Sequence, residues 1–168
     1  MGLVNFSSNV NVTWEIVKSN LNYPWDWDSL SANPNITFEI IKSNPNHLWN
    51  WLFVSENPNI TLDIVKANPD YPWDWSSLTI NKNMTWTIIQ ANLDYPWYWQ
   101  YISENPNITW DIIIGNLGLD WCLPEFSKNL NLTLKIVKSN PRVNWDWREI
   151  SKNPAITWEI VKANPKQN

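Results

Sequence analysis

The sequence is short of cysteine, glycine and cationic side chains. Its 168 residues include one Cys, three Gly, and 12 Lys plus Arg against 16 Asp plus Glu, which gives a net charge of −4. One cysteine cannot form an internal disulfide. An acidic balance also disfavours ligands whose affinity comes from neutralised phosphates. We therefore expect a reducing environment and no nucleic-acid partner.

Long apolar runs and targeting signals are also missing. No stretch reaches the ~18 apolar residues of a membrane-spanning helix. Residues 1–6 lack the basic and apolar regions of a secretory signal, and Phe6 stands where a myristoylation signal needs Ser or Thr. We therefore expect no membrane partner and an intracellular protein that is not secreted.

Tryptophan is the residue in excess. The chain holds 15 Trp, whereas average soluble composition gives roughly one or two per hundred residues. An excess of this size indicates either a repeated structural position or a binding surface.

The sequence repeats with a constant 24-residue period, marked by an Asn at position 1 from Asn9 to Asn153. Every Trp falls at position 6, 17 or 19. We expect residues 1–8 to form an N-terminal half-repeat cap, residues 9–152 six repeats, and residues 153–168 a C-terminal half-repeat cap. The constant residues expected to have structural roles are Thr13, Thr37, Thr61, Thr85, Thr109, Thr133 and Thr157 at position 5; Asn20, Asn44, Asn68, Asn92, Asn116, Asn140 and Asn164 at position 12; and Trp25, Trp49, Trp73, Trp97, Trp121 and Trp145 at position 17.

Each half of the repeat has the pattern of one short helix. Thr at position 5, and Asp or Asn commonly at position 18, are good helix N-caps. Asn at position 12, often followed by Pro, is typical of a helix end, where Asn can adopt a left-handed conformation. Helices of about six residues exist only when packed. The pattern therefore predicts an all-α fold, an α-solenoid of 24-residue repeats with two short helices each.

A β-solenoid is the alternative fold. Positions 4, 6 and 8, and positions 17 and 19, also alternate as in strands, and Asn or Trp ladders occur in stacked strands. However, adjacent apolar residues at positions 8 and 9 favour a helix. Rows of identical charges would also repel one another at the ~4.8 Å spacing of strands.

The sequence shows no pattern of a catalytic or metal-binding site. His47 replaces a Tyr found in other repeats, and Cys122 replaces a helix-cap residue with no His or second Cys near it in the sequence. No nucleophile–base spacing or metal-ligand spacing is present. We therefore expect no catalytic residue, no metal and no cofactor, and a protein that is not an enzyme.

The variable repeat positions are better candidates for binding than the tryptophans. Helices this short need buried Trp side chains for stability, so we expect most of the Trp residues to lie in the core. Positions 18, 20 and 21 vary between repeats, and variation on a constant scaffold is where a solenoid selects its partners. For the apolar candidates, local repacking is an equally good explanation. The partner-binding candidates are Leu52, Phe53, Tyr98, Gln100, Tyr101 and Arg148.

Two strings carry a family resemblance. Residues 105–112 read Asn-Pro-Asn-Ile-Thr-Trp-Asp-Ile, and residues 68–75 read Asn-Pro-Asp-Tyr-Pro-Trp-Asp-Trp. Together with the repeat over residues 9–168, they resemble the Trp-rich tandem repeats of uncharacterised proteins from giant DNA viruses. The resemblance implies a viral origin and a place in the host cytoplasm or the virion, and it implies no mechanism.

Three functions fit these observations. The first is a non-catalytic repeat scaffold for protein–protein interaction or viral structural assembly. The second is a carbohydrate-binding module that uses rows of Trp. The third is a self-assembling filament subunit, because a constant period favours end-to-end stacking. The expected partner is thus another protein or a second copy of the chain.

Overall fold

The computed structural model describes residues 6–154, 157 and 162. Within these residues it contains twelve short α-helices, one 3-10 helix and no strand. The chain divides into two compact units, residues 1–84 (unit 1) and residues 85–168 (unit 2). The predicted helical solenoid is confirmed, and the β-solenoid alternative is wrong for the part of the chain that the structure describes.

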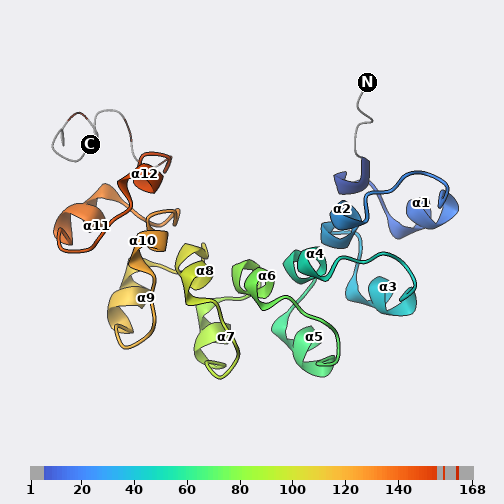
Figure 1. The fold of residues 1–168 in the computed structure, drawn as a ribbon, viewed down its shortest axis with the longest axis horizontal. Helices are drawn as coiled ribbons and strands as arrows, with labels where there is room; N and C mark the ends of the chain where they lie inside the picture. The colour runs from blue at the N-terminus through green and yellow to red at the C-terminus, as the bar shows by residue number, and fades with distance from the viewer. Residues whose placement is uncertain (1–5, 155–156, 158–161, 163–168) are drawn as a thin grey trace. The chain divides into compact units, whose positions relative to one another are not determined.

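In unit 1, a first helix follows position 5 of each repeat and a second helix follows position 18. The second helices α2 and α4 pack against each other, as do α4 and α6, and α2 also packs against the 3-10 helix η1. Figure 1 shows these second helices next to one another, with the first helices to one side. The first helices are α1 (Trp14–Ser19), α3 (Phe38–Ser43) and α5 (Leu62–Ala67), and the others are η1 (Phe6–Ser8), α2 (Trp27–Ala32), α4 (Trp51–Glu56) and α6 (Trp75–Ile80).

Unit 2 repeats the same arrangement. Its second helices α8 and α10 pack against each other. Pro124 lies in the first turn of α10, which spans only four residues of the irregular fifth repeat. The first helices are α7 (Trp86–Gln90), α9 (Trp110–Gly115) and α11 (Leu134–Ser139), and the second helices are α8 (Trp99–Glu104), α10 (Leu123–Phe126) and α12 (Trp147–Ile150).

The constant Thr at position 5 begins the first helices, as predicted. Thr37 Oγ1 accepts a hydrogen bond from the backbone N–H of Ile40 at 3.4 Å, and four later repeats have the same bond. Thr13 has the extended backbone of an N-cap but makes no side-chain cap hydrogen bond. The helix expected after Thr157, together with Asn164, lies outside the described residues.

The left-handed conformation expected at the position-12 Asn is wrong. Asn44 has a φ of −132°, and no described residue has a positive φ. The side chain ends the helix instead, because Asn44 Nδ2 donates to Ile40 O at 2.7 Å. The carbonyl of Asn44 then accepts from Trp49 Nε1 at 2.8 Å. Both bonds recur in the pairs Asn20–Trp25, Asn68–Trp73, Asn92–Trp97, Asn116–Trp121 and Asn140–Trp145.

The hydrophobic core runs along each unit between successive repeats. Its fully buried members come mainly from positions 4, 9 and 22, as with Val17, Leu30 and Ile36. Among the described tryptophans, Trp97 and Trp145 are buried, and the others are half-buried. The expectation that most Trp residues lie in the core is therefore met only in part: the half-buried Trp14, Trp25, Trp27 and Trp49 pack against a buried cluster of Val12, Val17 and Leu30 without being enclosed by it.

Candidate functional site

Buried amide side chains hold successive repeats in register. Asn57 Nδ2 donates to the carbonyl oxygens of Ser31, Asn33 and Ile36 at 2.8, 3.0 and 3.0 Å. These three carbonyls lie between the end of α2 and the start of α3. Asn129 makes the equivalent three hydrogen bonds in unit 2. Because buried polar groups without partners are costly, the constant Asn at position 1 sets the register of the repeats in both units.

Two further polar positions join the repeats. In unit 1, Asn59 Nδ2 donates to Pro34 O at 2.7 Å, and Ser31 Oγ accepts from the backbone N–H of Asn50 at 3.0 Å. Unit 2 has the same contacts. Sequence reasoning missed these roles, although near-constant Asn at position 3 and Ser at position 23 were visible signals.

The outward surface of the second helices differs from repeat to repeat. We define the second-helix face as positions 20, 21 and 24, since position 22 of each second helix is buried and position 23 is buried in all except α12. Of its members, only Ser77 is buried. The face comprises Asp28, Ser29, Ala32, Leu52, Phe53, Glu56, Ser76, Ser77 and Ile80 in unit 1, and Gln100, Tyr101, Glu104, Pro124, Glu125, Lys128, Arg148, Glu149 and Lys152 in unit 2.

The predicted partner-binding residues fall into three groups on or beside this face. On α4, Leu52 is 43% exposed beside the half-buried Phe53. At α8, the ring centroids of Tyr98 and Tyr101 lie 5.9 Å apart, with Gln100 exposed between them in the sequence. Arg148 is exposed on α12. The structure thus brings together the α4 pair and, separately, the two α8 tyrosines.

Unit 1 has an open hollow between η1, α2 and α4. It has a volume of about 420 Å³, and its lining includes three acidic residues, Asp26, Asp28 and Glu56, together with Phe53. The small residues Ser29 and Ala32 also line it. Sequence reasoning selected Phe53 but gave no sign of the hollow, which depends on how α2 and α4 pack.

Two of the three acidic residues that line the hollow, Asp28 and Glu56, have neutral hydrogen-bond partners. Asp28 Oδ1 accepts from Asn50 Nδ2 at 2.8 Å, and Glu56 Oε1 accepts from Ser77 Oγ at 3.4 Å. Neither carboxylate forms an ion pair with a Lys or Arg in the described part of the chain. No Lys or Arg is among the described residues that line the hollow, so its wall is negatively charged.

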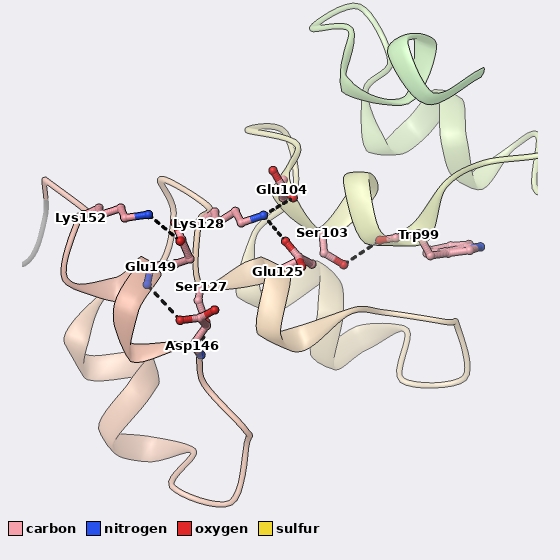
Figure 2. Close-up of polar contacts among 9 residues, drawn as sticks. All are labelled: Trp99, Ser103, Glu104, Glu125, Ser127, Lys128, Asp146, Glu149 and Lys152. Atoms are coloured by element: carbon pink, nitrogen blue, oxygen red, sulfur yellow. Dashed lines mark hydrogen bonds and ion pairs between the residues drawn. The ribbon is translucent and has the colours of Figure 1, made fainter. Parts of the chain in front are cut away.

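Unit 2 places a charged network between α8 and α10. Lys128 Nζ lies 3.0 Å from Glu104 Oε1 and also pairs with Glu125, as Figure 2 shows. Burial raises the pKa of Glu104 above its usual value. The hydrogen bond from Lys128 lowers the pKa of Glu125, and the same bond raises the pKa of Lys128. The Lys128–Glu125 pair is therefore ionised at neutral pH.

His47 packs against a tryptophan, and Cys122 lies at the start of a helix. The His47 ring stacks on Trp27 with centroids 4.7 Å apart, where Tyr71 packs on Trp51 in the next repeat. Cys122 is the N-cap residue of α10 and makes no side-chain cap hydrogen bond. Among the described residues, no group of three or more His, Cys, Asp or Glu side chains could hold a metal ion. None of the helices described is long and apolar enough to cross a membrane.

Comparison of the chain with models of known families, with curated proteins and with solved structures gave no significant match. The resemblance of residues 68–75 and 105–112 to giant-virus repeats therefore stays a prediction.

Proposed function

We propose that the chain is a non-catalytic helical-repeat scaffold that binds a protein partner through its second-helix face. One observation carries the proposal. The residues that join the repeats are constant, whereas positions 20, 21 and 24 change in size, charge and aromatic character from repeat to repeat. Extended surfaces of this kind are what repeat proteins use for binding.

The composition of the face supports a protein partner. Aromatic side chains and Arg are over-represented in protein interfaces and supply most hot spots, and the face presents Phe53, Tyr101 and Arg148. A scaffold whose register is held by buried amides also loses little conformational freedom when it binds, which favours affinity.

The titratable groups support a role without catalysis. The clearest network of shifted pKa values is Glu104, Glu125 and Lys128, and these three side chains are engaged with one another. A network in which one Lys is held by two carboxylates suits a structural role. A general acid and base need a proton-exchanging group directed at a substrate.

The contacts of the Trp rings favour the scaffold over the carbohydrate-binding alternative. A sugar-stacking platform needs an accessible ring face, whereas Trp49 meets Trp27 edge-to-face with centroids 5.1 Å apart. Trp121 meets Trp99 in the same way. The filament, the viral assembly role and the intracellular location rest on the sequence alone.

Selection from a library of displayed random peptides tests the proposal. The bait is the full chain, and the enriched peptides are then measured against two variants. The face variant carries Leu52→Ser, Phe53→Ser and Tyr101→Ser. The matched control carries Lys42→Ser, Asp63→Ser and Lys138→Ser, which change exposed positions of the first helices. Circular dichroism and thermal melting establish that both variants are folded.

We expect the enriched peptides to bind the wild-type chain and the control equally, and to bind the face variant at least tenfold more weakly. Equal binding to the wild-type chain and the folded face variant would mean that another surface recognises partners. Enrichment of glycans on an array, with no enriched peptide, would favour the carbohydrate-binding module.

A further inference from the structure

We infer that the hollow between α2 and α4 binds a basic side chain, Arg or Lys, from an extended segment of the partner. The inference rests on the proposed function and names the chemistry that the unit 1 face selects. Its volume of about 420 Å³ is near the lower end of ligand pockets, which are roughly 300–1,000 Å³. It suits one long side chain better than a folded surface.

The charge of the hollow favours a cation. Asp28 and Glu56 both line it, and their hydrogen bonds come from the neutral groups of Asn50 and Ser77. The described residues provide no ion pair to either carboxylate. The chain as a whole carries a net charge of −4, which would also attract a basic segment over longer distances.

The α2–α4 gap of unit 1 can be compared with the α8–α10 gap of unit 2, because the same repeat positions recur there three repeats later. There Glu104 and Glu125 stand where unit 1 has Ala32 and Phe53. The cation that lies between those carboxylates is Lys128, and its counterpart in unit 1 is Glu56. A gap between second helices therefore accommodates a Lys side chain between carboxylates in unit 2. In unit 1 the carboxylates come from other repeat positions, at Asp28 and Glu56, and no Lys or Arg in the described part of the chain lines the hollow.

The size of the hollow and the Phe53 side chain in its lining fit a long basic side chain. Ser29 and Ala32 replace the larger Tyr101 and Glu104 of unit 2, which leaves space beside α2. Phe53 supplies an aromatic ring, on which Arg stacks well. The apolar stem of Arg or Lys can pack on apolar atoms while its charged end meets carboxylates. Since no described group of three or more acidic, His or Cys side chains could hold a metal, an organic cation is the better fit.

The test uses labelled peptides and the full chain. The probe is a fluorescein-labelled, 12-residue Gly/Ser peptide with two Arg residues, and its control has citrulline in place of Arg. Citrulline has nearly the shape of Arg without the charge. Fluorescence anisotropy at low salt gives the affinities. We expect the Arg peptide to bind at least tenfold more tightly than the citrulline peptide, and to weaken as salt is added.

Five single substitutions, one of them a control, locate the binding. We expect Glu56→Gln and Phe53→Leu each to weaken the Arg peptide several-fold. Ala32→Lys places an internal cation in the hollow and should abolish binding, whereas Ala32→Gln adds similar bulk without charge and should weaken it less. Asp63→Asn removes one charge from the exposed surface of α5 and should leave the affinity within about twofold.

Equal binding of the Arg and citrulline peptides would overturn the inference, as would equal losses in Glu56→Gln and Asp63→Asn, which would indicate attraction by net charge alone. Either result would rule out a basic side chain as the ligand of the hollow. If the library peptides still required the second-helix face, the proposed scaffold function would stand. If, in addition, the library peptides bound the folded face variant as well as the wild-type chain, the proposed binding through the second-helix face would be ruled out too.

Discussion

The α2–α4 gap of unit 1 and the α8–α10 gap of unit 2 have the same repeat register and different chemistry. In unit 2, Lys128 joins Glu104 and Glu125 in an internal network. In unit 1, the gap is a hollow lined by Asp26, Asp28 and Glu56, and no Lys or Arg among the described residues lines it. Substitutions at three positions per repeat thus replace a gap that holds its own cation by one that has none, without changing the backbone register.

The two units also differ in how their second helices begin. The N-cap residues of α2, α4 and α6 are Asp26, Asn50 and Asp74, and all three accept a cap hydrogen bond. In unit 2, Tyr98 and Cys122 precede α8 and α10 without a side-chain cap bond, whereas Asp146 caps α12 as in unit 1. The helices form in both cases, which shows that packing and the buried amides determine the fold more than the caps do.

The largest expected loss of stability tests whether the buried Asn at position 1 contributes equally in the two units. Asn57→Ala in unit 1 and Asn129→Ala in unit 2 each remove an amide that makes three buried hydrogen bonds. Unsatisfied buried groups cost about 1–3 kcal/mol each, so we expect each variant to lose about 3 kcal/mol of unfolding free energy in urea denaturation. Losses that differ between the variants by more than about 1.5 kcal/mol would mean that the units are not built alike.

A smaller change in stability tests the charged side chains, in which the two gaps should differ. Lys128→Met leaves Glu104 and Glu125 without their cation, and we expect a loss of about 1 kcal/mol at pH 7, since the network is partly exposed. Glu56→Gln, which removes a carboxylate with no internal cation, should change stability by less than about 0.5 kcal/mol. Urea denaturation measures both, and equal losses would contradict the contrast between the two gaps.

The loss in Lys128→Met should depend on pH. The pKa of Glu125 is lowered from its usual 4.5 by Lys128, so its stabilising contribution is present above that value and disappears as the pH falls through the folded-state pKa. We therefore expect the difference between wild type and Lys128→Met to shrink below about pH 4.5. A difference that stays constant down to pH 3 would mean that Lys128 acts through packing alone.

The smallest effect repairs a missing cap. Cys122→Asp gives α10 the N-cap residue type that α2 and α6 have, and caps are worth about 0.5–2 kcal/mol. Because α10 is short and has Pro124 in its first turn, we expect a gain at the lower end, about 0.5 kcal/mol. Thermal melting compared with Cys122→Ala measures it. A melting temperature no higher than that of Cys122→Ala would show that packing alone positions α10.

Much of the fold could be predicted from the 24-residue period, because constant Thr at position 5 and paired apolar residues report local helix formation. The role of the position-12 Asn was mistaken, since a helix can end through a side-chain hydrogen bond without a left-handed residue. The inter-repeat bonds of Asn57 and Ser31 were missed because they depend on backbone groups 26 and 19 residues away.

The candidate surface was predicted only in part. Variation between repeats selected Phe53 and Tyr101, and the structure places both on the second-helix face. The Glu104–Lys128–Glu125 network and the hollow at Glu56 depend on which side chains of neighbouring repeats meet. Sequence variation alone does not give that information.

The most direct measurement is a two-dimensional nitrogen–proton NMR spectrum of the full chain titrated with the Arg peptide. We predict shifts at the backbone amides of Ser29, Ala32, Phe53 and Glu56. We also predict unchanged indole signals for Trp49 and Trp73, whose Nε1–H groups are hydrogen-bonded to Asn44 and Asn68. Shifts confined to the indole signals, with the α2 and α4 amides unmoved, would contradict a constant Trp-rich scaffold that binds through its variable second-helix face.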